Sequence, residues 1–358
     1  MKKISIFLLL IIVISSCVKE DYFGLSPYGN IKRIEVSNQA GNATIDTENL
    51  TITVEIPAGV DLSEITIEKL ELSSFATSSK KVGDKIDLNG KQEIIITAED
   101  GSQHHWSTES FIASATPQLS NWDLNLWYKT ASNYYEPGAD AASTIWGTGN
   151  QGTQILNKLA TIPEDLGEDN YAAHMETLDN GALAGTFGAP ISAGSLYTGV
   201  FNSDNLDPSD PEAAIEFGTP FTGRPKGIKV KYSYAPGPVN KDKKGNVLDY
   251  GDACDIYALF EIRLGGKTER LATAWFRSEA VQENLSSLEI PVTYGELDNS
   301  FPEYMRPVDH GFVSTDSASF VLPTHITFVA SSSFDGASFA GAIGSILIID
   351  DVEMIYEE

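Results

Sequence analysis

The sequence contains few of the residues that cross-link a fold or bind a metal. Its 358 residues include two cysteines, five histidines and four methionines. Two cysteines cannot build the multiple-disulfide framework of a small secreted protein. The histidines lack the H-E-x-x-H spacing of a zinc protease, and no C-x-x-C motif occurs. The common short signatures of zinc and redox chemistry are therefore absent from the sequence.

Basic residues are also scarce. The chain has 24 Lys and Arg against 50 Asp and Glu, which gives a formal net charge of −26. Nucleic-acid binding and electrostatic docking to anionic lipid both need a basic surface, so neither is an expected partner. The acidic composition is compatible with divalent cations and with neutral glycans, and it identifies neither.

Long apolar runs are missing except at the N-terminus, where Ile4–Ile14 follows two lysines. This run suits a signal peptide and is too short to span a bilayer comfortably. Two serines then precede Cys17, as in a lipoprotein signal peptidase site. We expect residues 1–16 to be a signal peptide and Cys17 to be the lipidated N-terminus, with ordinary secretory cleavage as the alternative.

Residues 17–30 read as a tether. Its Val18–Asp21 tract, a lysine followed by two acidic residues, resembles the surface-export signal of lipoproteins in glycan-foraging Gram-negative bacteria. We therefore expect an outer-membrane location, with the lipid as the only membrane anchor and the chain facing the cell exterior. A solvated linker is the alternative for this tract, and outer-membrane protein partners stay open.

Period-two patterns begin after the tether. Leu50–Ile56 alternates apolar and polar residues, Ile65–Leu72 and Glu93–Ala98 are rich in β-formers, and Asp100-Gly101 suits a hairpin turn. These features predict a small β-sandwich over residues 31–113.

The remaining residues, 118–358, continue the strand pattern at greater length. Ile256, Ala258 and Phe260 alternate with Tyr257, Leu259 and Glu261, and no long amphipathic helix occurs. The sequence therefore predicts an all-β protein with a second, larger sandwich. Cys254 opens this strand with no identifiable base beside it, which favours a buried structural thiol over a nucleophile.

Six segments of the C-terminal region carry a family resemblance. They are Trp146–Asn150, Ala193–Gly199, Phe217–Gly227, Lys231–Tyr234, Phe339–Ser345 and Ile349–Val352. In this order they resemble the "putative carbohydrate metabolism domain" of surface lipoproteins from glycan-degrading bacteria. The resemblance implies a jelly roll related to galactose-binding-like modules and a role near complex glycans. The N-terminal region is similar to the Ig-like domains that often precede this family.

A carbohydrate site needs aromatic faces for pyranose rings and polar groups for their hydroxyls. We nominate Trp146, Asn150, Arg224, Tyr257 and Trp275 as carbohydrate-binding residues. Arg224 could clamp hydroxyls or a carboxylate with its forked donors. The alternatives are core packing for each aromatic ring and a structural ion pair for Arg224.

Two acidic segments are candidates for Ca²⁺. The Ile-Asp-Asp-Val sequence containing Asp350 and Asp351 is similar to the last strand of jelly-roll carbohydrate-binding modules, where one carboxylate helps to bind a structural Ca²⁺. The loop Asp204–Glu212 is the weaker candidate, because it lacks the central glycine of an EF-hand loop. Gly147–Gly152 fits G-x-G-x-x-G, but no βαβ unit follows, so a dinucleotide site is not expected.

The leading functional hypothesis is a non-catalytic surface lipoprotein that binds or holds complex carbohydrate during glycan utilisation. The alternatives are a glycoside hydrolase and a cell-surface adhesion or assembly protein. Hydrolysis needs two facing carboxylates. Among 50 acidic residues some pair will always qualify, so the sequence assigns no catalytic residue.

Overall fold

The computed structural model describes residues 24–57, 59–112, 116–186, 188–202, 211–264 and 266–357. The predicted signal peptide, Cys17 and the Val18–Asp21 tract lie outside these residues. Two hydrophobic cores form without sharing a residue. We call the parts that build them the N-terminal unit (24–112) and the C-terminal unit (116–357). Nearly all regular structure in both units is β-strand, so the predicted all-β sandwich class is confirmed.

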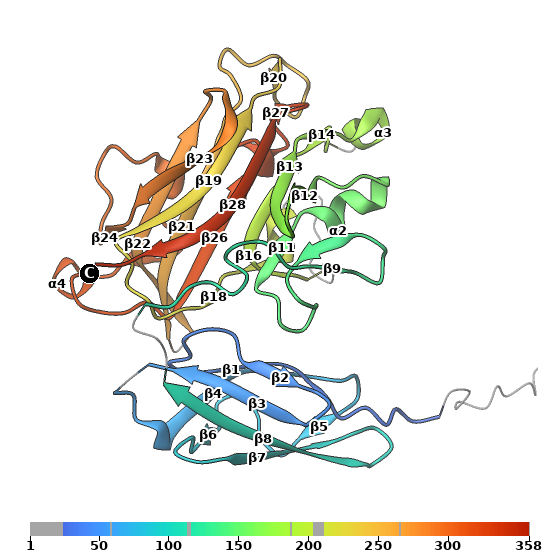
Figure 1. Ribbon diagram of the computed structural model, residues 1–358, viewed down its shortest axis with the longest axis vertical. Coiled ribbons are helices and arrows are strands. Elements are labelled where there is room, and N and C mark those ends of the chain that lie inside the picture. Colours follow the sequence, from blue (N-terminus) through green and yellow to red (C-terminus); the bar gives the residue numbers. More distant parts are fainter. Residues whose placement is uncertain are drawn as a thin grey trace, which may run out of the picture.

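The N-terminal unit packs a three-stranded sheet, order β1-β4-β6, against a five-stranded sheet, order β2-β3-β8-β7-β5 (Figure 1). Ile52, Val54 and Ile56 of β3 are fully buried, which confirms the predicted half-buried strand. The predicted turn joins β7 to β8, and Gly101 there has a φ of +86°, a region open to glycine. The elements are β1 (Ile31–Val36), β2 (Thr44–Asp46), β3 (Thr51–Ile56), η1 (Leu62–Glu64), β4 (Ile65–Leu72), β5 (Thr77–Ser78), β6 (Lys85–Ile86), β7 (Gln92–Thr97) and β8 (Gln103–Ile112).

The C-terminal unit is a larger two-layer sandwich. A nine-stranded sheet has the main order β11-β16-β26-β21-β22-β24, with β17, β18 and β25 paired beside this path. A five-stranded sheet has the order β12-β13-β28-β19-β23, and the larger core fills the space between the two layers.

The strands of these two sheets come from most of the C-terminal unit. The nine-stranded sheet contains β11 (Trp146–Thr148), β16 (Ser195–Phe201), β17 (Ile215–Phe217), β18 (Thr219–Pro220), β21 (Cys254–Leu264), β22 (Lys267–Ser278), β24 (Thr293–Tyr294), β25 (Gly311–Phe312) and β26 (His325–Ser331). The five-stranded sheet contains β12 (Thr161–Gly167), β13 (Asn170–Glu176), β19 (Gly227–Ala235), β23 (Gln282–Pro291) and β28 (Ile346–Ile355).

Short elements connect the strands of the C-terminal unit. Its helices have at most six residues, and no helix in the described chain is long and apolar enough to cross a membrane. The short strands are β9 (Trp127–Lys129), β10 (Tyr135–Pro137), β14 (Leu178–Asp179), β15 (Ile191–Ser192), β20 (Asn240–Lys241) and β27 (Gly341–Ala342). The helical turns are α2 (Asn150–Thr153), η2 (Gln154–Leu156), α3 (Gly181–Thr186), η4 (Pro211–Ala214), η5 (Glu303–Met305), α4 (Thr315–Ala318) and η6 (Gly336–Ser338).

Strand β21 shows how the sequence sets the two faces of the nine-stranded sheet. Ile256, Ala258 and Phe260 are fully buried in the core, whereas Tyr257 and Leu259 between them are only partly buried. Successive side chains of a strand point to opposite faces, so this alternation confirms the predicted two-faced strand. The side of the sheet that bears Tyr257 points away from the core.

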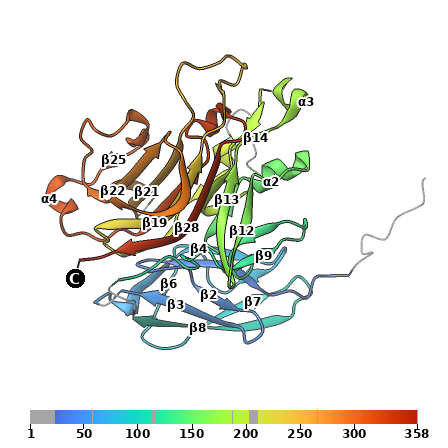
Figure 2. The same cartoon turned by 45° about the horizontal axis from the view of Figure 1, so that its top comes forward.

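The two units lie against each other at one end of the C-terminal sandwich. Figure 1 shows the N-terminal unit below the larger sandwich, at the end where β18 lies, and Figure 2 shows the two units from a second direction. Thr219 of β18 donates a hydrogen bond to Asn42 of the N-terminal unit, with 2.9 Å between the oxygens. The N-terminal unit therefore contacts β18, a short strand of the nine-stranded sheet.

Candidate functional site

The side of the nine-stranded sheet that points away from the core carries a polar and aromatic surface, which we call the outer face. Its residues follow the cross-strand register of β21 with its neighbours β22 and β26, so they form four rows across three strands. These rows are Arg277–Asp255–Ser331, Trp275–Tyr257–Val329, Thr273–Leu259–Thr327 and Arg270–Glu261–His325.

Asp255 is the polar centre of one end of the outer face. Its carboxylate accepts hydrogen bonds from Trp275 Nε1 at 2.9 Å and from the Tyr304 hydroxyl at 3.0 Å, and Arg277 Nη2 lies 3.4 Å away. Burial raises the pKa of this carboxyl above its usual range, and the Arg277 charge opposes that rise. Asp255 thus holds three side chains in one geometry.

Arg277 lies among aromatic rings. Its guanidinium carbon is 3.7 Å from the ring centre of Phe334 and 4.8 Å from that of Tyr304. Guanidinium over an aromatic face is a favourable cation–π arrangement. Its Nε is buried without a hydrogen-bond partner among the described residues. Arg277 therefore has an N–H group available for a further hydrogen bond, and aromatic rings lie around it.

Trp275 brings further rings together. Phe301 and Tyr304 lie 6.1 Å and 6.5 Å from it, measured between ring centres, and both come from the segment that follows β24. Tyr304 is 47 % exposed. We call Asp255, Trp275, Arg277, Phe301, Tyr304 and Phe334 the Trp275 cluster. Its combination of ring faces, a carboxylate and a guanidinium is chemically suited to a hydroxyl-rich ring with apolar faces.

The other end of the outer face is an ion-pair network around Glu261. Its carboxylate lies 2.6 Å from Arg263 Nη2, 3.3 Å from Arg270 Nη2 and 3.7 Å from His310 Nε2. Asp255 and Glu261 are six residues apart on one strand, a separation of about 20 Å. A glycosidase holds its two carboxylates about 5–9.5 Å apart, so these two cannot form that pair.

The structure brings two of the five predicted sugar-binding residues together. Tyr257 and Trp275 are direct cross-strand partners on the outer face. Trp146 is buried in the core, where it packs edge-on against Phe328 at 5.7 Å between ring centres. Asn150 is fully buried and binds Thr161 through its amide, which ties α2 to β12. Neither Trp146 nor Asn150 reaches the surface in this conformation.

The contacts of Arg224 are with residues outside the Trp275 cluster. Its two terminal nitrogens donate to the carbonyl oxygens of Val321 and Ala318 at 2.8 Å and 2.7 Å. The guanidinium also stacks 3.7 Å above the ring centre of Tyr294. Arg224 thus binds main-chain carbonyls where a carboxylate partner was one of the expectations, and its nomination as a sugar-binding residue stays a prediction.

Asp350 and Asp351 lie in the last strand at a bulge opposite Lys231. The Lys231 ammonium is 3.6 Å from Asp350 Oδ2 and also forms an ion pair with Asp351. Among the described residues, no group of three or more His, Cys, Asp or Glu side chains could hold a metal. Most of the loop Asp204–Glu212 lies outside those residues. Lys231 thus pairs with both carboxylates in this structure, and the Ca²⁺ site at Asp350 and Asp351 stays a prediction.

Cys254 is a buried thiol, as predicted. Its Sγ donates weakly to the Ser278 carbonyl oxygen, and burial raises its pKa to about 12. A thiol with so high a pKa is not a nucleophile at neutral pH.

Of the six members of the Trp275 cluster, sequence reasoning nominated only Trp275. Asp255 and Arg277 each lie two residues from a nominated aromatic, so strand alternation could have placed them on the same face. Tyr304 lies in a turn-rich segment, where no periodic signal links it to β22.

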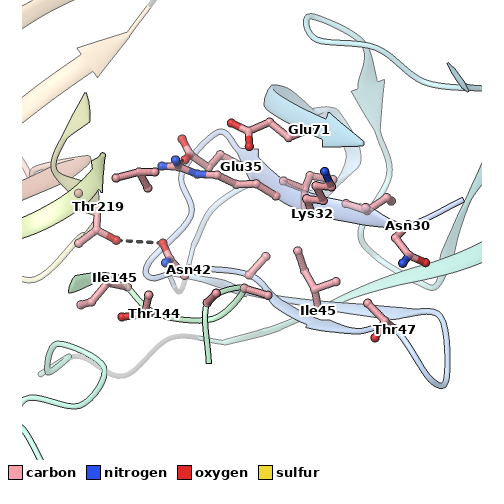
Figure 3. A pocket seen from close by; sticks show the side chains of 18 of the residues that line it. Asn30, Lys32, Glu35, Asn42, Ile45, Thr47, Glu71, Thr144, Ile145 and Thr219 are labelled. Carbon is pink, nitrogen blue, oxygen red and sulfur yellow. Dashed lines mark hydrogen bonds and ion pairs between the residues drawn. The ribbon is translucent and has the colours of Figure 1, made fainter. Parts of the chain in front are cut away.

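A cavity lies between the two units (Figure 3). Its volume is about 390 Å³, and β1 and β2 form two of its walls. The lining combines charged side chains with an aliphatic surface and contains no aromatic ring. It therefore differs from the aromatic outer face.

These features define a two-layer β-sandwich protein with an aromatic and charged outer face. Residues 120–355 match the family described as "Putative carbohydrate metabolism domain", and the chain belongs to this family. The predicted family assignment is therefore confirmed. Comparison with curated proteins gave no match.

Solved structures from Bacteroides share the fold. A "putative glycoside hydrolase" from Bacteroides thetaiotaomicron is 22% identical, has a TM-score of 0.58, and the match covers 93% of this chain and 98% of that chain. A "putative glycoside hydrolase" from Bacteroides vulgatus is 23% identical, with a TM-score of 0.52 and coverage of 66% of this chain and 97% of that chain. At these identities the likeness shows the fold alone.

Proposed function

We propose that this protein binds a complex carbohydrate on the outer face, with the Trp275 cluster and Tyr257 as the contact surface. The observation that carries the proposal is the pairing of Tyr257 with Trp275 beside Asp255 and Arg277. The rings offer apolar faces to a pyranose, and the charged groups can hydrogen-bond its hydroxyls. Membership of a carbohydrate metabolism family supports the same ligand class.

Calorimetric titration against a panel of plant, host and microbial polysaccharides tests this proposal. Trp275→Ala should weaken binding about 30-fold, which corresponds to about 2 kcal/mol for a central aromatic contact. Tyr257→Ala is the second variant, because it leaves the hydrogen bonds to Asp255 in place. Tyr135→Ala is the matched control, since Tyr135 is an exposed tyrosine of β10, outside the outer face. The proposal fails if no glycan binds, or if all three variants bind equally well.

Hydrolysis is the second candidate function, because the two similar Bacteroides structures are described as putative glycoside hydrolases. Asp255 has the raised pKa of a general acid, but Trp275, Tyr304 and Arg277 already surround its carboxylate. Binding without turnover therefore fits this geometry better. Release of reducing sugar by the wild-type chain, and its loss in Asp255→Asn, would instead support hydrolysis.

Display on the cell surface completes the proposal. The sequence of residues 1–21 supports export, lipidation of Cys17 and an outward position in the outer membrane. Metabolic labelling with a fatty acid should tag the wild-type chain and leave Cys17→Ser untagged. Accessibility of the chain to protease added to intact cells should then report outward display.

A further inference from the structure

Among the described residues, polar side chains of the two units meet in a group of contacts that we call the inter-unit latch. Glu216 of β17 lies 2.5 Å from Lys69 Nζ and 3.9 Å from Arg33 Nη1, both in the N-terminal unit. The hydrogen bond from Thr219 to Asn42 completes the latch, and Figure 3 shows this bond at one end of the cavity between the units. One carboxylate of the C-terminal unit thus meets two cations of the other unit.

A cavity lies beside the latch, so the two units are not packed against each other at this place. About 390 Å³ of unfilled space separates β1 and β2 from the C-terminal residues around Thr144 and Val200. Domains joined without a large hydrophobic interface are expected to move relative to each other. Next to this cavity, polar contacts rather than dense packing must therefore restrain the units.

The residue after Glu216 connects the latch to the outer face. The Phe217 carbonyl oxygen accepts a hydrogen bond from Arg263 Nη1 at 2.8 Å, and Arg263 in turn binds Glu261. The Phe217 ring packs edge-on against Tyr197 at 5.5 Å between ring centres. A displacement of β17 would therefore move the partners of the outer-face network.

Gly218 packs closely against the side chain of Arg263. Its φ is +96°, and a Cβ at this position would lie 2.8 Å from Arg263 Nη2. The backbone that carries Phe217 and Gly218 is thus packed directly on the Arg263 guanidinium. Through this contact β17 connects the latch to Arg263 and, through Arg263, to Glu261.

We infer that Lys69 and Arg33 are positioning residues, through which the N-terminal unit holds β17 and thereby the Glu261 end of the outer face. The effect on affinity rests on the proposed function, and it requires that the bound glycan extend along β21 from the Trp275 cluster to the Glu261 end of the outer face. The N-terminal unit is then part of the binding apparatus and not only a spacer. Because the latch is partly exposed, salt should weaken it: at 1 M salt the screening length is about 3 Å.

Hydrogen exchange of the full chain tests the latch without any ligand. Lys69→Met and Glu216→Gln should each speed exchange of the β16–β18 amides about two- to five-fold, as expected for loss of a partly exposed ion pair. Lys85→Met is the matched control, because its pair with Glu64 lies wholly within the N-terminal unit. The charge reversal Glu216→Lys should speed exchange more than Glu216→Gln does, because its ammonium would face both Lys69 and Arg33. Unchanged exchange in both single variants would overturn the inference.

Affinity for a glycan that binds the wild-type chain tests the positioning role. Lys69→Met should weaken it about two- to five-fold, Glu216→Lys should weaken it further, and Lys85→Met should leave it unchanged. Faster exchange with unaltered affinity would overturn the positioning role. If no glycan binds the wild-type chain, the proposed function fails, and the exchange result still decides whether the latch exists.

Discussion

Replacing Glu136 by glutamine should remove a pH-dependent loss of stability. Glu136 lies in β10, is only 5 % exposed, and its Oε1 accepts a 2.8 Å hydrogen bond from the Thr148 hydroxyl. Its Oε2 is buried with no hydrogen-bond partner among the described residues. Burial therefore raises its pKa from 4.5 to about 7.

The direction of this pH dependence follows from the linkage between proton binding and folding. The folded chain binds the Glu136 proton more tightly than the unfolded chain does, so the free energy of unfolding falls as the pH rises from 4.5 to about 7. The pKa of Glu136 differs by about 2.5 between the folded and unfolded chain. At 1.36 kcal/mol per pKa unit, this difference lowers the free energy of unfolding by about 3 kcal/mol. The full loss is present above pH 7 and disappears below pH 4.5.

Urea unfolding followed by tryptophan fluorescence at pH 4, 6 and 8 measures this effect. The stability of Glu136→Gln relative to wild type should increase by about 3 kcal/mol between pH 4 and pH 8. Taking the difference between the two proteins cancels the titration of the other carboxylates. Glu283→Gln, at an exposed position of β23, is the control and should show no such trend. A constant difference between Glu136→Gln and wild type across this pH range would refute the reasoning.

Three further predictions concern residues nominated from the sequence. Arg224→Ala should lower the free energy of unfolding by about 2 kcal/mol through loss of two charged hydrogen bonds, while calorimetry shows unchanged glycan affinity. Weakened affinity at unchanged stability would contradict its structural role. Trp146→Ala should cost about 3–5 kcal/mol in urea unfolding, and a cost below 1 kcal/mol would argue against its core position. In a Cys17→Ser background, Cys254 should resist iodoacetamide at pH 8 until the chain unfolds, and rapid native-state labelling would contradict its burial.

Alternation is the part of the fold that the sequence states most clearly. A strand with one face in a core must place apolar residues at every second position, so β3 and β21 could be predicted nearly residue by residue. The same rule predicted that Tyr257 would lie opposite Ile256 and Ala258. Family resemblance then supplied the ligand class, which alternation alone cannot give.

Contacts between distant segments explain what could not be predicted. Arg224 finds its carbonyl partners 94 and 97 residues further along the chain, and Tyr304 meets Asp255 across 49 residues. Trp146 belongs to a three-residue strand, which is too short for alternation to indicate its face. These environments depend on how loops cross the sheets, and local sequence carries no signal for that.

A hydrogen-exchange footprint of the bound glycan tests the central claim most directly. We predict that a saturating glycan slows exchange in β21, β22 and residues 301–310, around Asp255, Trp275 and Tyr304. Protection confined to the five-stranded sheet, or to the cavity between the units, would place the carbohydrate elsewhere and contradict the account.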